Sequence, residues 1–152
     1  MTLWDFIGLS EDFNYHDYLI AETGEYYNAA AHGGTVTGAS NSTDGLGFLC
    51  TKSMSFTQAA KVGWEVNEGD LLGNLTEDNG ADELIDKGFR MFVVTIADGV
   101  EVDVYVLHMD AASRAADIAA RESQLAQLAA YIKNTNNKRP ILVIGDTNCR
   151  YT

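Results

Sequence analysis

A glycine and two polar residues that could do chemistry follow an apolar run near the end of the chain. The run extends from Ile141 to Ile144, and Gly145, Asp146 and Asn148 come after it. A short continuous apolar run bounded by turn residues predicts a fully buried strand, and open α/β sheets bind ligands at the carboxyl ends of their strands. An aspartate there can activate a nucleophile or hold a metal, and an asparagine can donate hydrogen bonds to a phosphoryl oxygen.

Two more polar groups end predicted strands. Glu11 ends the strand predicted over 4–11, and His108 lies at the end of an apolar stripe on the strand predicted over 100–109. If the sheet brings these strand ends together with Asp146, a cluster of carboxylate, imidazole and amide groups results. Such a cluster suits metal-assisted hydrolysis of a phosphate ester, because Mg²⁺ takes oxygen ligands, needs only one or two carboxylates and polarises the phosphoryl oxygen.

Each of these residues also has an ordinary structural interpretation. Glu11 could be an acid at the start of the helix that follows, Asp146 a turn former, and His108 a structural histidine. Arg121 projects from the apolar stripe of a predicted helix, so it must either snorkel, pair with a structural acid or position a strand-end residue. The order in which these residues follow strands along the chain favours the functional interpretation.

Apolar periodicity and turn residues predict the elements that carry this cluster. They are strands over 4–11, 25–32, 45–51, 54–66, 89–97, 100–109 and 141–144, and helices over 14–23 and 113–134. Asp98-Gly99 between two β-rich runs predicts a hairpin with a type I′ turn. The residues between these elements, 33–45 and 67–88, are expected to be loops. The pattern predicts an α/β fold of the α+β type, with a mixed, largely antiparallel sheet and flanking helices.

The predicted helix over 113–134 carries one apolar stripe at helical spacing. The stripe consists of Ile118, Ala119, Leu125, Leu128, Ala129 and Ile132. Tyr15, Tyr18 and Leu19 are expected to form the apolar side of the shorter helix. We expect these residues to pack on the sheet.

Composition limits the classes of protein to consider. The chain has 152 residues, 46% of them hydrophobic, which suits one folded domain over 1–152. No apolar run approaches the roughly 20 residues of a membrane span, and the N-terminus lacks the features of a signal peptide. Cys50 and Cys149 could form one disulfide, but two buried free thiols are the favoured expectation. The formal net charge of −12 disfavours non-specific binding to nucleic acid.

Four motifs resemble the endonuclease/exonuclease/phosphatase superfamily, which includes pancreatic deoxyribonuclease, abasic-site endonucleases and neutral sphingomyelinases. Asp5-Phe-Ile-Gly-Leu-Ser-Glu11 is similar to a motif whose Glu binds Mg²⁺, and the segment ending in His108 resembles a Thr-His-Leu motif whose His binds the scissile phosphate. Arg121 and Gln124 resemble the Arg-x-x-Gln of the following helix. Gly145-Asp-Thr-Asn148 is similar to a Gly-Asp-Phe-Asn motif, whose Asp aligns the attacking water and whose Asn contacts phosphate.

Further likenesses favour one branch of this superfamily. Lys87-Gly-Phe-Arg90 and the residues around His108 and Asp146 resemble the secreted sphingomyelinase-like phosphodiesterases, and Asp44-Gly45-Leu46 matches loosely. The superfamily also has a metal-binding Asn on an earlier strand and an Asp-His pair near its end, and neither has a counterpart in this chain. The resemblance therefore implies part of a four-layered αββα sandwich, and exposed sheet edges that invite self-association or a partner segment.

The resemblance implies a Mg²⁺-dependent phosphodiester hydrolase, with Mn²⁺ or Ca²⁺ as alternative metals. Glu11 would bind the metal, His108 and Asn148 would bind phosphate oxygens, Asp146 would orient the nucleophile, and Arg121 would position a strand-end residue. The acidity favours a phospholipid headgroup or another small phosphodiester as substrate. The alternatives are a nuclease of the same superfamily and a non-catalytic binding module or inactive fragment, and this chain alone is expected to be weakly active at best.

Overall fold

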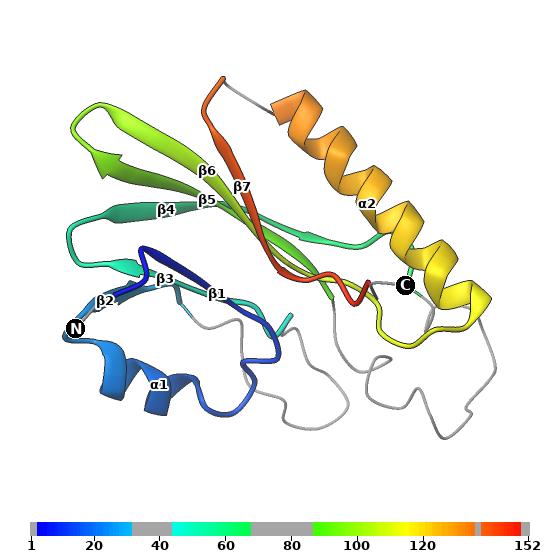
Figure 1. Ribbon diagram of the computed structural model, residues 1–152, viewed down its shortest axis with the longest axis horizontal. Helices are drawn as coiled ribbons and strands as arrows, with labels where there is room; N and C mark the ends of the chain where they lie inside the picture. The colour runs from blue at the N-terminus through cyan, green and yellow to red at the C-terminus, as the bar shows by residue number, and fades with distance from the viewer. Residues whose placement is uncertain (1–2, 32–43, 68–86, 136–137, 150–152) are drawn as a thin grey trace.

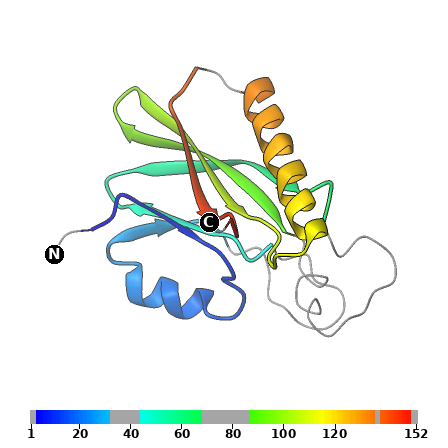
Figure 2. The same ribbon diagram turned by 45° about the vertical axis from the view of Figure 1, so that its right-hand side comes forward.

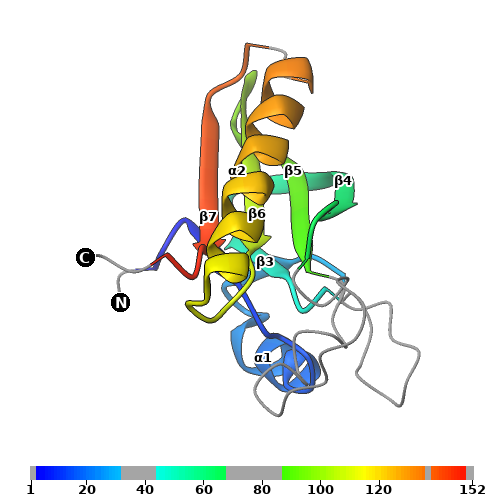
Figure 3. The ribbon, with the colours of Figure 1, turned by 90° about the vertical axis from the view of Figure 1, so that its right-hand side faces the viewer.

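Two β-sheets lie face to face in the computed structural model, with one helix outside each sheet (Figures 1 and 3). The structure describes residues 3–31, 44–67, 87–135 and 138–149. The elements are β1 (Phe6–Leu9), α1 (His16–Thr23), β2 (Tyr27–Ala29), β3 (Gly47–Thr51), β4 (Ser55–Gly63), β5 (Gly88–Ala97), β6 (Val100–His108), α2 (Ala115–Thr135) and β7 (Ile141–Asp146). The layers follow the order α1, three-stranded sheet, four-stranded sheet, α2. The expected α+β sandwich is therefore confirmed.

The strand order is β1-β3-β2 in one sheet and β4-β5-β6-β7 in the other. Every pairing is antiparallel except β6 with β7, which α2 connects as a crossover. The turned view in Figure 2 shows α2 lying along the four-stranded sheet. Because β6 and β7 are parallel, His108 and Asp146 are register partners at the same edge of the sheet.

Two apolar clusters hold the layers together. The cluster between the sheets contains Phe48, Phe92, Val94, Val104 and Val106, with other buried residues around them. The alternation along β6 that placed His108 on the face of Val104 and Val106 is thus confirmed, and this face meets the other sheet. The second cluster lies between the four-stranded sheet and α2, and consists of Trp64, Phe89, Met91, Tyr105, Leu107, Met109 and Leu128.

Strand β7 differs from its prediction as a fully buried strand. Ile141 is 38% exposed and Val143 is 43% exposed, because β7 is an edge strand in the described sheet and its helix-side face is only partly covered. Its other face packs well, since Leu142 and Ile144 contact the cluster between the sheets.

The two helices also differ from their predicted apolar faces. On α2, Ile118 and Leu125 are exposed, because the helix is rotated so that Asp117, Arg121 and Gln124 face the protein. Tyr15, which precedes α1, and Tyr18 within it are exposed, and no residue of α1 is buried. The described helices include none that is long and apolar enough to span a membrane.

Two smaller predictions need correction. The hairpin over β5 and β6 is confirmed, but the turn is not type I′, because Gly99 has a φ of +70° whereas Asp98 is not at positive φ. The pairing instead shifts between Thr95 and Ala97, which places a bulge beside the turn.

Cys50 is buried and free as expected, and burial raises the pKa of its thiol. Cys149 is free but exposed, because it lies on the loop beyond edge strand β7. Most residues of the two predicted loops lie outside the described residues.

Candidate functional site

The predicted site residues converge where β1, β6 and β7 end. His108 Nε2 lies 4.0 Å from Glu11 Oε1, so the end of β6 meets the turn after β1 across the two sheets. The His108 side chain is 2% exposed, whereas that of Glu11 is 69% exposed. A nearly buried imidazole and a solvent-facing carboxylate therefore form one wall of the site, and solvent or a ligand can reach the carboxylate.

The turn after β7 brings the other two predicted residues to the same place. Asn148 donates its backbone N–H to Asp146 Oδ1 at 2.8 Å, and its side-chain Nδ2 donates to Met109 O at 2.8 Å. The carboxamide is thus fixed against the residue that follows His108. Asn148 Nδ2 has a second hydrogen, so it can still donate to a ligand.

The close approach of β7 to β6 explains the glycine of this motif. Gly145 has a φ of +132°, and a Cβ atom there would lie 2.0 Å from the carbonyl oxygen of Leu107. Only glycine fits a backbone in this conformation and this close to its neighbour. Gly145 therefore places Asp146 beside His108, and the spacing of the Gly-Asp-x-Asn motif has a geometric cause.

Helix α2 holds the segment that follows His108. Arg121 Nη1 donates to the carbonyl oxygens of Asp110, Ala111 and Ala112 at 2.9–3.0 Å, and Gln124 Oε1 accepts from the Asp110 backbone N–H. Of the alternatives considered for Arg121, these bonds fit positioning rather than pairing with a structural acid. The polar face of α2 thus fixes the backbone immediately beyond the candidate site.

Trp64, the residue after β4, supports the same segment. Its Nε1–H donates to the carbonyl oxygen of His108 at 2.7 Å, and its ring is buried against Phe89. The sequence indicates no role for Trp64, although its position near the end of the strand predicted over 54–66 was a signal that it belongs to the same edge as His108.

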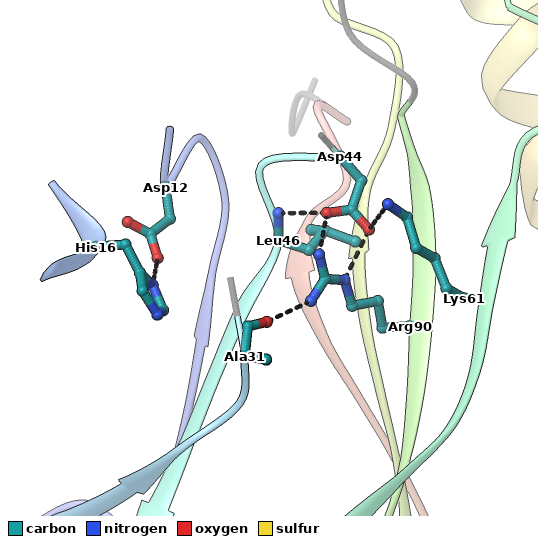
Figure 4. Close-up of polar contacts among 7 residues, drawn as sticks. All are labelled: Asp12, His16, Ala31, Asp44, Leu46, Lys61 and Arg90. Carbon is teal, nitrogen blue, oxygen red and sulfur yellow. Dashed lines mark hydrogen bonds and ion pairs between the residues drawn. The ribbon is translucent and has the colours of Figure 1, made fainter. Parts of the chain in front are cut away.

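A buried charge cluster lies at the same end of the sandwich and was also missed. Asp44 accepts two hydrogen bonds from the Arg90 guanidinium, at 2.7 and 2.6 Å, and a third from the Leu46 backbone N–H (Figure 4). Lys61 Nζ lies 3.7 Å from the same carboxylate, and Arg90 also donates to Ala31 O. The motifs containing Asp44 and Arg90 had been noted only as likenesses.

Asp12 and His16 form a second contact that the sequence did not indicate. Asp12 Oδ2 lies 2.6 Å from His16 Nδ1 (Figure 4). Asp12 directly follows Glu11 in the chain, and His16 is the first residue of α1. The pair anchors the start of α1 at the end of the chain segment that carries Glu11.

The donor set of the site is compatible with a hard divalent cation but does not form a complete coordination shell. In the part of the chain that the structure describes, no group of three or more His, Cys, Asp or Glu side chains could hold a metal. Glu11 offers an accessible carboxylate, and Asp146 is exposed nearby. Mg²⁺ is often held by one or two carboxylates together with water and substrate phosphate, so these two residues fit that mode of binding.

No protein-family model and no curated protein matches this sequence. Solved structures do match it. The chain superposes on a humanized D. rerio TDP2 with a TM-score of 0.67 and 16% identity, over 96% of this chain and 50% of that one. The human Nocturnin catalytic domain with bound sulfate gives a TM-score of 0.61 and 15% identity, over 96% of this chain and 52% of that one. D. rerio TDP2 complexed with a single-strand DNA product gives a TM-score of 0.65 and 15% identity, over 97% of this chain and 49% of that one.

TDP2 and Nocturnin are members of the endonuclease/exonuclease/phosphatase superfamily. The chain therefore has the fold of that superfamily, as the motifs indicated, and it spans about half the length of the solved structures it matches.

Proposed function

We propose that this chain forms the catalytic half-site of a metal-dependent phosphodiester hydrolase. The observation that carries the proposal is the contact between His108 and Glu11, beside Asp146 and Asn148 at the ends of adjacent strands. A nearly buried imidazole, two exposed carboxylates and a carboxamide at one edge of the sheets are the groups needed to bind a phosphoryl group and orient a water molecule.

In the proposed reaction water attacks phosphorus in line with the leaving oxygen. Asp146 would orient the water, while His108 and Asn148 would donate hydrogen bonds to the phosphoryl oxygens and stabilise the charge that develops there. Glu11, with Asp146 near it, would hold the metal. A bound Mg²⁺ would neutralise negative charge on the phosphoryl and leaving oxygens. Arg121 is a positioning residue, because it holds the backbone after His108.

A small phosphodiester such as a phospholipid headgroup is our preferred substrate. The net charge of −12 opposes the long-range attraction of a polynucleotide. A nuclease is the second candidate, because one structure with the same fold holds a single-strand DNA product. Adding single-stranded DNA as a competitor separates the two: strong competition at 0.15 M salt would favour the nuclease.

Hydrolysis of bis(p-nitrophenyl) phosphate tests the proposal. We expect slow, Mg²⁺-dependent turnover by the 152-residue chain, loss of activity with EDTA, and loss of at least about 100-fold in His108→Ala, the scale of a group that stabilises the transition state. His16→Gln is the matched control, because this histidine also contacts a carboxylate but lies on α1. Turnover unchanged in His108→Ala, or none from folded protein, would overturn the proposal and favour a non-catalytic module.

A further inference from the structure

A cavity of about 400 Å³ adjoins the candidate site and takes no part in the reaction proposed above. Its walls come from the segment after β6, the first half of α2 and the loop after β7, and they include Ala112, Ile118, Leu125 and Cys149. Resting on the proposed function, we propose that this cavity binds an apolar alcohol group of the substrate. The substrate would then be a phosphodiester that carries an alkyl chain on one of its oxygens.

The two loops that hold the proposed phosphate-binding groups also form the cavity. Cys149 directly follows Asn148 in the chain, and Asn148 Nδ2 donates to Met109 O at 2.8 Å. Ala112 comes three residues after Met109, and its carbonyl oxygen accepts from Arg121 Nη1 at 3.0 Å. The cavity wall therefore lies one residue along the chain from the carboxamide that would bind a phosphoryl oxygen, which suits a group esterified to that phosphate.

Two residues with an unfavourable backbone conformation flank the cavity. Ala112, which lines it, has a φ of 65°, and Asn148, which precedes Cys149, has a φ of 51°. Residues other than glycine seldom adopt a positive φ, and where the surrounding structure holds them in it they cluster at ligand sites. Here Arg121 holds Ala112, and the bond to Met109 holds Asn148. Both walls are therefore fixed before a ligand binds.

The lining suits an apolar group better than an ion. Most of its surface is apolar, and Ile118 and Leu125 on α2 are 46% and 45% exposed. Among the described residues that line the cavity, the charged ones are Arg121 and Glu122, one of each sign. An alkyl chain that covers the two aliphatic side chains displaces water from them, which is favourable. Ligand sites commonly have volumes of about 300–1,000 Å³, so this cavity suits one chain rather than a whole lipid.

The thiol of Cys149 reports on the cavity without any turnover. It is exposed whereas Cys50 is buried, so N-ethylmaleimide should alkylate Cys149 alone in the folded chain. We expect octyl phosphate to slow this alkylation at least about fivefold, because its chain covers the thiol, and inorganic phosphate to change it less than about twofold. Mass spectrometry of tryptic peptides measures both rates. Equal protection by the two ligands, or none, would overturn the inference.

A matched pair of variants separates the cavity from unspecific binding of an amphiphile. We expect Ile118→Gln to raise the octyl phosphate concentration needed for protection about tenfold, because apolar contact equal to roughly two methylene groups is lost. Val100→Gln is the control, because Val100 is 45% exposed but lies at the start of β6, at the opposite end of that strand from the site. Protection that rises with protein concentration, and not with octyl phosphate, would show that a second copy of the chain covers the cavity and would overturn the inference.

Kinetics with octyl and methyl p-nitrophenyl phosphate separate this inference from the proposed function. We expect KM to be about tenfold lower for the octyl compound, and this difference to disappear in Ile118→Gln but not in Val100→Gln. If neither compound is hydrolysed but octyl phosphate protects Cys149, the apolar cavity stands and the proposed reaction fails. If both are hydrolysed with the same KM and Cys149 is not protected, the apolar cavity is wrong and the reaction stands.

Discussion

The two ends of the four-stranded sheet each bury an aspartate bound to an arginine, but they use the pair differently. At the end where β6 and β7 finish, Asp44 accepts hydrogen bonds from the Arg90 guanidinium and from the Leu46 backbone N–H. Arg90 is itself only 2% exposed. At the end where β6 begins, Asp103 accepts one hydrogen bond from Arg139, and its Oδ2 has no hydrogen-bond partner among the described residues.

The surroundings of the two pairs differ in charge. Arg139 also donates to the carboxylate of Glu101 and is partly exposed to solvent. This arginine is therefore bound by two carboxylates, those of Asp103 and Glu101. Its hydrogen bond to Asp103 raises the pKa of Arg139, so the guanidinium keeps its charge. At the other end, Lys61 Nζ lies 3.7 Å from the Asp44 carboxylate, and both residues line a cavity. The comparison teaches that similar ion pairs differ in burial: Asp44 and Arg90 are both buried, whereas Arg139 of the other pair is partly exposed.

The largest expected difference in stability between the two ends comes from replacing one glycine at each end by alanine. Gly145→Ala would place a Cβ 2.0 Å from Leu107 O, so β7 must move away from β6, and we expect a loss of at least about 5 kcal/mol in the free energy of unfolding. In Gly99→Ala, at the opposite end, the new Cβ meets no atom within 4 Å. The free energy of unfolding should therefore fall by only about 1 kcal/mol, the cost of a φ of +70° for alanine. Urea denaturation followed by circular dichroism measures both. Similar losses would mean that the close approach at Gly145 is not rigid.

The two aspartates give the next largest contrast. Asp44→Asn leaves the buried Arg90 guanidinium without its counter-charge, which we expect to cost about 3–5 kcal/mol. Asp103→Asn should cost about 1 kcal/mol, because Arg139 is partly exposed and keeps Glu101. The same denaturation experiment compares the variants. Equal costs would show that the cluster around Asp44 is no more tightly coupled than the pair at the other end.

Replacing Arg121 tests whether α2 positions the backbone segment that follows His108. Arg121→Met leaves three carbonyl oxygens without their donor, so we expect a loss of about 2–4 kcal/mol in stability, together with slower hydrolysis because the backbone after His108 is released. Leu125→Ala, on the exposed flank of the same helix, is the control and should cost less than about 1 kcal/mol. If Arg121→Met is no more harmful than the control, α2 does not position the site.

The smallest effect concerns the first turn of α2. Burial by itself would raise the pKa of Asp117, but the hydrogen bonds that Arg114 donates from its backbone and side chain outweigh burial and lower that pKa. A lowered pKa in the folded state means that the carboxylate stabilises the protein above its ordinary pKa of 3.8, and that this stability is lost as the pH falls below it.

Asp117→Asn should therefore cost about 1–2 kcal/mol at pH 7 and progressively less below pH 4. Denaturation midpoints of both proteins from pH 7 to pH 3 measure this difference. Glu122→Gln, exposed on the same helix, serves as the control. A difference between Asp117→Asn and the native chain that does not shrink with falling pH would contradict the assignment.

The sequence by itself determined the order of the elements and which polar residues end the strands. Period-two alternation placed His108 on the face of Val104 and Val106, and the turn residues after Ile144 placed Asp146 and Asn148 beyond a strand. Such patterns are local, because side-chain direction along a strand or helix follows from backbone geometry alone.

Only the tertiary structure decided what those residues meet. The rotation of α2 buries Arg121 and Gln124 and leaves Ile118 and Leu125 exposed, because three backbone carbonyls and one N–H of the segment after His108 need partners there. The gathering of Asp44, Lys61 and Lys87 from distant parts of the chain likewise has no local signal. Long-range pairing of strands brings these groups together, and the cost of leaving a buried polar group unpaired then selects how each side chain turns.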